Sequence, residues 1–486
     1  MKGSILVRTF TKSAKNICAF PLVNLIVLLL VISCDDPLPP DPPPVSEPDV
    51  LTQLQSLSGV EVTEITPQNG YERQFELLFS QPVDHNNPEG LQFKQRVYLS
   101  HINIDAPVVF MPSGYSANPI TVSQVSEILS ANQIYAEQRY MSTSNENPRD
   151  WQHLTMEQTS ADFHKIVLQL KSIYNNAWLS YGASKNGIAA LFHRRYYPDD
   201  VDAVFTKVTP LSLGAEDQRY EDFLNTVGDE FARNKIKAYQ RALLKKRSEI
   251  LPLIKNYMIN SNLNYSVTED VILEFETCEF AFSFWQTTDR NVSQIPDSTA
   301  SAEELFSYLS DFGYIPYYSV DYVKFFEPVY YQAYTELGWY RLVNDHLKDL
   351  LITFENPSWS YFAPKGIPLN FKQDVIPNLI DWLQTDGDNI IYIYAEEDPW
   401  TAGALENIGG TNALKVIQPG ANHIIDLNTL DQKELVFTTL FDWLRISPPQ
   451  ENIIISNEIK INESNSNRGL NNQPITIFTL INWSLK

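Results

Sequence analysis

The chain has 486 residues, of which 43% are hydrophobic and 12% aromatic, enough to bury a sizeable core and to exclude wholesale disorder. Its 36 Lys and Arg against 59 Asp and Glu give a formal net charge of −23, so we expect no nucleic-acid partner, because the chain lacks a broad basic field for phosphates. Three cysteines are too few for a disulfide-stapled scaffold or a cysteine-based zinc module.

Residues 1–34 are predicted to be a lipoprotein signal peptide. Four cations and no acid accompany an apolar run over 19–32, which is typical of a secretory signal and short for a membrane span. The run ends in Val31-Ile32-Ser33-Cys34, which resembles a bacterial lipobox, so Cys34 is the predicted lipidation site. An uncleaved anchor helix is the alternative. Both place the rest of the chain outside the cytoplasm. With a lipid anchor, we expect it in a bacterial cell envelope, periplasmic or exposed at the outer membrane surface.

Residues 35–50 are predicted to be a tether. Residues 35–48 contain seven prolines, which cannot form a helix or an interior strand and favour an extended polyproline II spacer. Removal of the leader takes away four of the 36 cations and no acid. The mature chain then carries 32 cations against 59 acids, a net charge of −27.

Between residues 51 and 213, strand patterns alternate with helix patterns. Two runs, 71–79 and 93–100, are separated by a turn-rich segment and predict an antiparallel hairpin. The predicted buried strands that follow are 107–112, 177–181 and 202–208, and the predicted helices are 154–174 and 188–197. This alternation predicts the first part of an α/β core with a parallel sheet.

Residues 214–385 break the alternation. They are helical in pattern and rich in aromatic residues, and they predict a lid insertion between two strands of the sheet. The second part of the core is predicted over 386–446, with strands at 389–395 and 414–418 and a closing helix at 430–444. Residues 447–486 are polar and rich in asparagine, and they predict a loosely ordered tail.

The segment Tyr181-Gly182-Ala183-Ser184-Lys185-Asn186-Gly187 lies between a predicted strand and a predicted helix. This is the context that a nucleophile elbow requires, with small residues around the serine so that the turn can close. Ser184 is the candidate nucleophile, and the backbone N–H of Lys185 is the candidate donor to an oxyanion at the helix N-terminus. An ordinary strand-to-helix turn is the alternative.

A serine nucleophile needs a base and an acid that orients the base. Of the seven histidines, His423 is the one in a loop after the last predicted strand, and it is the candidate base. Asp398 follows the strand at 389–395, which suits the order Ser, Asp, His of α/β-hydrolases, and Glu396 and Glu397 compete with it. The second oxyanion donor is expected after the strand at 107–112, from the N–H of Tyr115 or of Gly114. A plain turn is equally compatible there.

Taken together, these segments resemble the tripeptidyl aminopeptidases of serine peptidase family thirty-seven, over about residues 81–444. The matching blocks are Gln81–His85, Glu137–Tyr140, Ser184–Asp202, Asp398–Trp400 and Gly420–His423. The resemblance implies an α/β-hydrolase fold with a mostly helical lid between the nucleophile and acid strands. It also implies a serine exopeptidase that releases short peptides, tripeptides in this family, from free N-termini through an acyl-enzyme.

Besides Ala183, which stands for a glycine in the elbow and should be tolerated there, the chain departs from the family pattern at three positions. Asn186 replaces a glycine in the elbow, Gln138 replaces a histidine, and Ser113 stands where an acid is expected. Two other classes of function therefore stay open: a carboxylesterase or lipase on the same fold, and a catalytically inactive binding protein of the envelope.

An aminopeptidase also needs a carboxylate to meet the α-ammonium group of its substrate. The candidates for substrate binding are Glu137, Glu216 and Glu279, each of which is equally an ordinary surface acid, and Trp285 is a candidate for lining the peptide cleft. Packing within the lid is an equally good explanation for the aromatic residues. The sequence has no metal-ligand spacing and no dinucleotide-binding loop, so we expect no cofactor.

Overall fold

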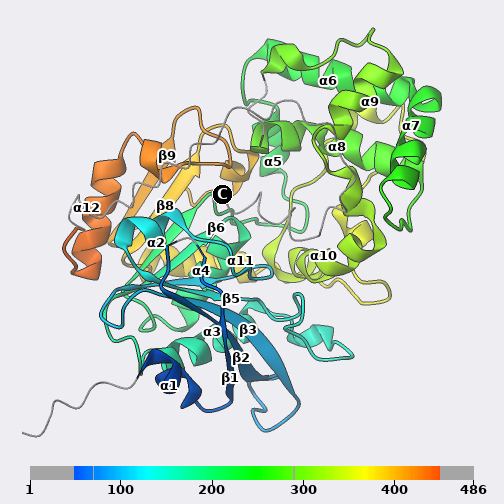
Figure 1. The fold of residues 1–486 in the computed structure, drawn as a ribbon. Helices are drawn as coiled ribbons and strands as arrows, with labels where there is room; N and C mark the ends of the chain where they lie inside the picture. The colour runs from blue at the N-terminus through cyan, green and yellow to red at the C-terminus, as the bar shows by residue number, and fades with distance from the viewer. Residues whose placement is uncertain (1–48, 69, 288–290, 449–486) are drawn as a thin grey trace, which may run out of the picture. The chain divides into compact units, whose positions relative to one another are not determined.

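Figure 1 shows the computed structural model, which describes residues 49–448 apart from 69 and 288–290. The predicted signal peptide, the lipidation site Cys34, most of the tether and most of the tail lie outside the described residues. Asp49 caps the first helix, which begins at Val50, so the last two residues assigned to the tether belong to the fold. In the described part of the chain, no helix is long and apolar enough to cross a membrane.

A twisted sheet runs through the core, and it has nine strands within the described residues. In chain order they are β1 (Val60–Ile65), β2 (Arg73–Pro82), β3 (Gln92–His101), β4 (Val108–Pro112), β5 (Asn132–Ala136), β6 (Trp178–Ala183), β7 (Ala203–Lys207), β8 (Ile390–Ala395) and β9 (Ala413–Gln418). Their order in space is β1-β2-β3-β5-β4-β6-β7-β8-β9. In this spatial order, the neighbours β1-β2, β2-β3 and β3-β5 pair antiparallel. All later neighbours, from β5-β4 to β8-β9, pair parallel.

The burial of the strands explains which of them the sequence predicts. Strands β4, β6, β7 and β8 are buried at every position, as expected for parallel strands covered on both faces, and their continuous apolar runs predict them well. The predicted hairpin is confirmed as β2 and β3, which pair from Arg73–His101 to Pro82–Gln92. The sequence predicts neither β1 nor β5, because β1 is a polar edge strand and β5 opens with Asn132 and Gln133, which leave it without a continuous apolar run.

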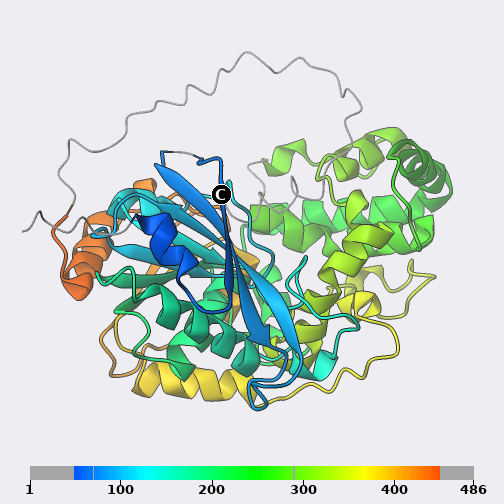
Figure 2. The same ribbon diagram turned by 60° about the horizontal axis from the view of Figure 1, so that its bottom comes forward.

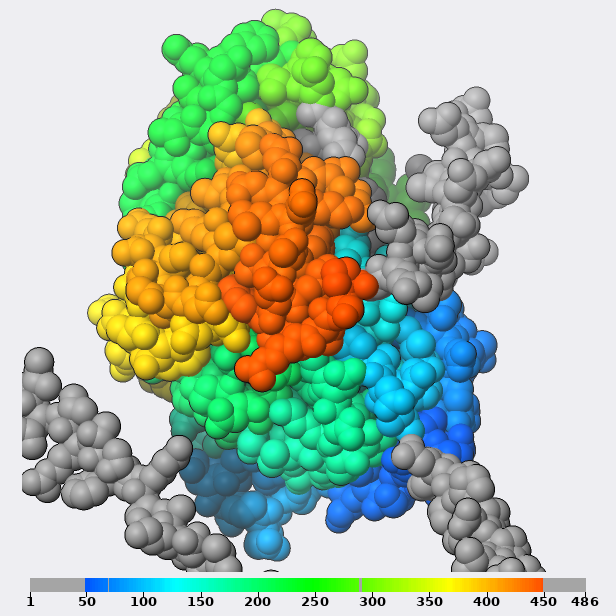
Figure 3. Space-filling model, turned by 90° about the vertical axis from the view of Figure 1, so that its left-hand side faces the viewer, coloured from blue at the N-terminus to red at the C-terminus, as the bar shows by residue number. Residues whose placement is uncertain are grey.

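Helices cover both faces of the sheet (Figure 2). The core helices are α1 (Val50–Gln55), α2 (Gln124–Leu129), α3 (Met156–Leu170), α4 (Lys185–Tyr196), α11 (Val375–Thr385) and α12 (Lys433–Leu444). Helices α3, α4 and α11 share one apolar cluster with one face of the sheet, and α2 and α12 share another cluster with the opposite face. In Figure 3, α12 (orange to red) faces the viewer at the surface of the molecule.

The lid lies between β7 and β8 in the chain and has its own apolar core. Its helices are α5 (Arg219–Leu224), α6 (Glu230–Lys245), α7 (Arg247–Asn260), α8 (Glu269–Thr287), α9 (Ala302–Ser310) and α10 (Val320–Gln332). The predicted insertion, 214–385, extends too far, because α11 packs in the core cluster with α4. A helix is needed there, since parallel neighbours such as β7 and β8 must be joined by a crossover that returns over the sheet.

Candidate active site

Ser184 lies at the turn between β6 and α4, with the backbone angles φ 55° and ψ −129°. A positive φ is sparsely populated for serine, so the rest of the turn must hold it in place. A Cβ atom on Gly182 would lie 2.3 Å from the Asn186 carbonyl oxygen, and one on Gly187 would lie 1.8 Å from Thr209 Oγ1. Both positions therefore require glycine. The predicted strand–turn–helix geometry of a nucleophile elbow is present around Ser184.

The candidate acid and base are hydrogen-bonded to each other. Asp398 follows β8, His423 follows β9, and Asp398 Oδ2 lies 2.6 Å from His423 Nδ1, with both side chains almost fully buried. The other carboxylate oxygen accepts a hydrogen bond of 3.1 Å from the Trp400 N–H. This arrangement favours the tautomer with its proton on Nδ1, which leaves Nε2 as the base. The His423 loop is also fixed to the lid, because its N–H donates to the Gln286 carbonyl of α8 at 2.9 Å.

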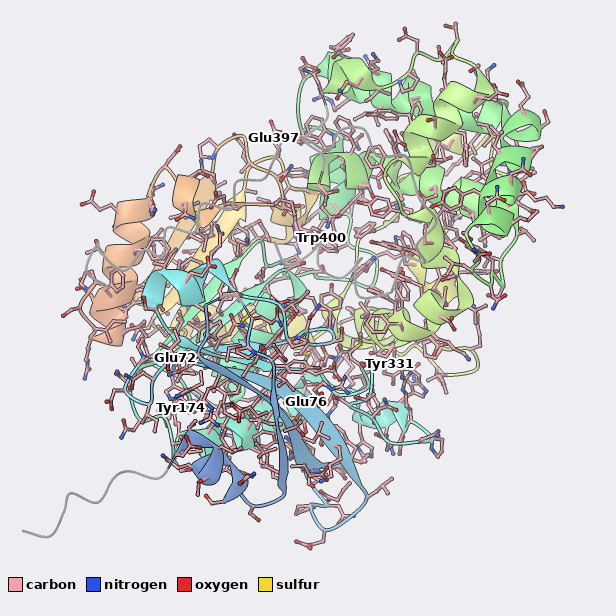
Figure 4. All side chains as sticks on the ribbon, viewed as in Figure 1. Glu72, Glu76, Tyr174, Tyr331, Glu397 and Trp400 are labelled. Atoms are coloured by element: carbon pink, nitrogen blue, oxygen red, sulfur yellow. The ribbon has the colours of Figure 1, made fainter. Side chains whose placement is uncertain are left out.

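The competing acids have other contacts. Glu396 Oε2 accepts a hydrogen bond of 2.9 Å from the Gly420 N–H and so braces the loop after β9. Burial and the neighbouring Glu396 raise the pKa of Glu397. In Figure 4, Glu397 lies near the edge of the molecule and Trp400 well inside it. Of these acids, Asp398 is the one that contacts the His423 ring.

Ser184, Asp398 and His423 follow β6, β8 and β9, and these three strands run parallel. The carboxyl ends of parallel strands meet at one edge of the sheet, where ligands of α/β folds bind. Among the contacts of the described residues, no hydrogen bond joins the Ser184 hydroxyl to the His423 ring. Such bonds are often long without a substrate and tighten in the complex.

The candidate oxyanion donors differ in what they contact. The Lys185 N–H, at the first position of α4, has no acceptor within the described part of the chain. The Tyr115 N–H donates to Ser113 Oγ at 2.9 Å, and the Gly114 N–H donates to the Asn186 side-chain oxygen at 2.7 Å. An oxyanion at the Tyr115 N–H would compete with a neutral hydroxyl, and hydrogen bonds to a charged acceptor are the stronger ones.

A cavity of about 350 Å³ lies at Ser184. Core and lid both contribute to it. Its lining residues are Tyr115, Ser184, Lys185, Ile188, Pro210, Ser212, Ala333, Leu337, Gly338, Trp339 and Trp400. Trp285 lines another cavity, in the lid, and packs against Gly228.

The Lys185 side chain has contacts that the sequence does not reveal. Its Nζ donates to the Gly114 carbonyl at 2.5 Å and to the side-chain oxygens of Gln138 and Gln332, both at 2.8 Å. Burial lowers the pKa of Lys185 to about 7, and no carboxylate pairs with it in the described part of the chain. Gln332 ends the lid helix α10, so Lys185 connects the elbow, the loop at Gly114 and the lid.

The three departures from the family pattern lie around this network. Asn186 binds the Gly114 N–H and is 3.4 Å from Ser113 Oγ, while Gln138 binds Lys185. Changes far apart in the sequence therefore meet at one loop. A list of residue differences gives no sign of this, because the contacts exist only after β4, β5 and β6 pair.

The candidate substrate-binding acids lie in different surroundings. Glu137 is buried, and its two oxygens accept hydrogen bonds from Ser144 Oγ and the Ala117 N–H, at 2.6 and 3.1 Å. Glu216 is exposed. Glu279 is buried in the lid and keeps one oxygen, Oε2, without a hydrogen bond. In the described residues, no group of three or more His, Cys, Asp or Glu is placed to hold a metal ion.

The order of the sheet, the serine on a strained turn and the buried histidine–aspartate pair together define an α/β hydrolase. A family model described as PS-10 peptidase S37 matches residues 44–464, and the chain belongs to this family. It is therefore a serine peptidase, and the resemblance seen in the sequence is confirmed.

Relatives and solved structures are similar to the chain to different degrees. Prolyl tri/tetrapeptidyl aminopeptidase of Streptomyces mobaraensis is 31% identical over 412 residues, which are 82% of this chain and 86% of that protein. Proline iminopeptidase of Mycobacterium smegmatis is 11% identical, with a TM-score of 0.37 over 76% of this chain and 99% of that one. Acetyl xylan esterase 1 from Thermoanaerobacterium sp. JW/SL YS485 is also 11% identical, with a TM-score of 0.34 over 81% and 90%.

Proposed function

We propose that the protein is an exported exopeptidase that removes short peptides, tripeptides above all, from the free N-terminus of peptide substrates. The observation that carries the mechanism is the buried contact of 2.6 Å between Asp398 and His423. These residues follow β8 and β9 in the same sheet in which the strained turn after β6 presents Ser184. The product length rests on the relative from Streptomyces mobaraensis, which is a prolyl tri/tetrapeptidyl aminopeptidase.

In the proposed mechanism, Ser184 Oγ attacks the carbonyl carbon of the scissile bond while His423 Nε2 takes the hydroxyl proton. Asp398 stabilises the imidazolium, and the N–H groups of Lys185 and Tyr115 bind the oxyanion. The tetrahedral intermediate collapses, the C–N bond breaks, and the leaving amine takes the proton from His423. A water molecule, activated in turn by His423, then hydrolyses the acyl-enzyme and restores Ser184.

The lid supports an exopeptidase rather than an endopeptidase. Ala333, Leu337 and Trp339, from the end of the lid, line the cavity at Ser184. A covered site of this kind admits a chain end but not a continuous chain passing through it. Lid residues beside Ser184 therefore support the release of short products from one end.

Export and lipid anchoring belong to the same proposal. The sequence support is the basic, apolar leader ending in Val31-Ile32-Ser33-Cys34, followed by the proline-rich segment 35–48. Cys34 would carry the lipid and become the N-terminus of the mature protein in a bacterial envelope. Mass spectrometry of the membrane-bound protein tests this, because it gives both the first residue and the mass of any acyl groups.

The function is tested by pairing covalent labelling with substrate profiling. A fluorophosphonate probe should label the wild-type protein at Ser184 and leave Ser184→Ala unlabelled. Ser184→Ala should lose at least a factor of about 10⁴ in kcat with its melting temperature nearly unchanged. Tripeptidyl p-nitroanilides with a free amine should be cleaved, and the same peptides with an acetylated amine should be cleaved far more slowly.

Each remaining class of function gives a different result. Labelling of Ser184 with turnover of p-nitrophenyl esters but of no peptide would identify an esterase. An absence of label at Ser184 would reject every serine-hydrolase mechanism for this chain. Equal cleavage of free and acetylated peptides would retain the peptidase but reject an aminopeptidase.

A further inference from the structure

Helix α8 carries a buried polar stripe through the middle of the lid. Glu276, Glu279, Ser283 and Gln286 are spaced by three, four and three residues, which places them on one face of the helix. The helix is otherwise rich in buried apolar and aromatic residues. Two carboxylates in such surroundings are costly unless they have partners.

Glu279 has an incomplete set of partners. Its Oε1 accepts hydrogen bonds from Tyr340 Oη at 2.9 Å and from Ser283 Oγ at 3.1 Å. Its Oε2 is buried without a hydrogen bond of normal geometry, although only 8% of the residue is exposed, and the Trp359 Nε1–H, which also lacks an acceptor, works to lower the Glu279 pKa. Glu276 is 4% exposed, and within the described residues neither carboxylate forms an ion pair with a cation. The lid therefore contains two buried acids with no positive charge beside them.

Glu274, on the same helix, provides an internal comparison. Its carboxylate accepts hydrogen bonds from Arg247 at 2.7 Å and from the N–H groups of Ile352, Thr353 and Phe354 at 2.8–3.2 Å. These contacts lower its pKa. A structural carboxylate in this lid is therefore fully satisfied by the chain, whereas Glu279 has an oxygen left over.

The acid pair adjoins the candidate active site. Tyr340, which donates to Glu279, is in ring contact with Trp339 and Trp400, with ring centroids 5.5 and 5.2 Å apart. Both tryptophans line the cavity at Ser184. Along α8, Glu279 precedes Gln286, whose carbonyl holds the His423 loop, by seven residues or about 10 Å. Three extended peptide residues also span about 10 Å.

We propose that Glu279, together with Glu276, is the receptor for the α-ammonium group of the peptide substrate. The inference rests on the proposed aminopeptidase function and deepens it. The ligand class is a primary ammonium at the end of an extended peptide. Oε2 of Glu279 accepts one of its N–H groups, and the surrounding aromatic rings exclude water and add cation–π attraction.

The surroundings of Glu276 and Glu279 determine how readily the two carboxyl groups ionise when no substrate is bound. Burial, and for Glu279 the neighbouring Glu276, raise the pKa of Glu279 to about 8 and that of Glu276 to about 7. The other titratable groups that face the pair are Cys278 and the tyrosines at 257, 314, 317, 318, 330 and 340, all with raised pKa values. These groups stay neutral near pH 7, so the two carboxyls alone change charge there.

The raised pKa of Glu279 predicts how protein stability depends on pH. This dependence distinguishes an acid that waits for a ligand from one that stabilises the fold. A carboxyl whose pKa is raised on folding binds more protons in the folded state, so its effect is to lower stability as pH rises from about 4.5 towards 8. Glu279→Gln removes that effect, because the amide does not ionise. The variant should melt at a higher temperature than the wild type at pH 8, and the difference should shrink at pH 5.

The activity test uses the full mature chain and two forms of one substrate. For Glu279→Gln we expect kcat/KM for a free-amine tripeptidyl p-nitroanilide to fall about 10- to 100-fold, the value of one charged hydrogen bond. The ratio of kcat/KM for the free peptide to that for its acetylated form should fall by the same factor. Glu127→Gln, which changes an exposed acid on α2 with a raised pKa, is the control and should keep this ratio.

Two outcomes would overturn the inference: an unchanged ratio in Glu279→Gln, or a melting temperature at pH 8 lower than that of the wild type. A direct binding measurement separates this failure from failure of the proposed function. Calorimetry on Ser184→Ala compares the tripeptide Ala-Ala-Ala with its acetylated form. The same measurement is made on Ser184→Ala with Glu279→Gln added. If the wild type cleaves no peptide but Ala-Ala-Ala binds less tightly when Glu279→Gln is present, Glu279 is still the ammonium receptor and the proposed peptidase function is wrong.

Discussion

Asp398 in the core and Glu279 in the lid are both buried carboxylates, and they differ in how their oxygens are used. Asp398 has a partner on each oxygen, the His423 ring and the Trp400 N–H. Glu279 has both of its partners on Oε1 and none on Oε2. The core thus holds its acid in a finished arrangement that orients another residue of the chain. The lid keeps an acid whose arrangement is completed only by a ligand.

The core repeats this pattern at Arg139. Its guanidinium is fully buried and makes two hydrogen bonds to Asp162, at 2.7 and 2.8 Å, with further bonds to the backbone carbonyls of Val83 and His153 at 2.8 and 2.9 Å. Removing one partner of such a pair leaves an uncompensated buried charge. Arg139 is therefore a buried charge whose partners the chain itself supplies.

The largest expected effect is on the contact between Asp398 and His423 in the core. Asp398→Asn keeps the size of the side chain but favours the wrong tautomer of His423, since an amide can donate to Nδ1. We expect kcat to fall by about 10⁴ with the melting temperature within a few degrees of the wild type. Steady-state kinetics on a tripeptidyl p-nitroanilide measures the loss. If Glu396→Gln and Glu397→Gln lost more activity than Asp398→Asn, the acid would be misassigned.

The next effect compares two acids on one helix. Glu274→Gln leaves Arg247 without its buried partner and should lower the free energy of unfolding by about 3 kcal/mol, near the lower limit for breaking a buried pair. Glu279→Gln should change stability in the opposite direction at pH 8. Urea unfolding of both variants at that pH gives the two values. Destabilisation of similar size in both would remove the distinction between the satisfied and the unsatisfied acid.

The smallest effect concerns Lys185, the buried cation beside Ser184. Its folded pKa of about 7 lies below the ordinary value of 10.5, so the folded state binds fewer protons than the unfolded state between these two values. Its contribution therefore makes stability rise with pH from about 7 to about 10. Lys185→Met removes this rise. The melting temperature at pH 9 minus that at pH 6.5 should therefore be lower in the variant than in the wild type.

Lys185→Met should also affect catalysis, because the ammonium group holds the Gly114 carbonyl and Gln332. We expect kcat to fall about tenfold, the equivalent of one hydrogen bond that positions the loop at Tyr115. Lys171→Met changes a partly exposed lysine near Trp178, at the other end of β6 from Ser184, and serves as the control for loss of a positive charge. An unchanged dependence of stability on pH in Lys185→Met would mean that Lys185 does not titrate in this range.

Local patterns in the sequence predict much of the core. The continuous apolar runs of β4, β6, β7 and β8 are visible because both faces of these strands are buried, and the stripe of α3 is visible because one face is. The elbow is also a local signal, since Gly182 and Gly187 are required by atoms within the turn and next to it. The polar edge strand β1 and strand β5 lack such signals.

The sequence by itself determined the α/β class, the position of the elbow and the family, because each depends on residues that are neighbours along the chain. Tertiary structure alone decided which acid meets His423, that α11 belongs to the core, and that Ser113, Gln138 and Asn186 lie at one loop. It also decided which buried acids lack partners, since Glu274 and Glu279 look alike in the sequence. Much of their difference comes from the N–H groups of Ile352, Thr353 and Phe354, which lie 78 to 80 residues beyond Glu274 and contact it only after folding.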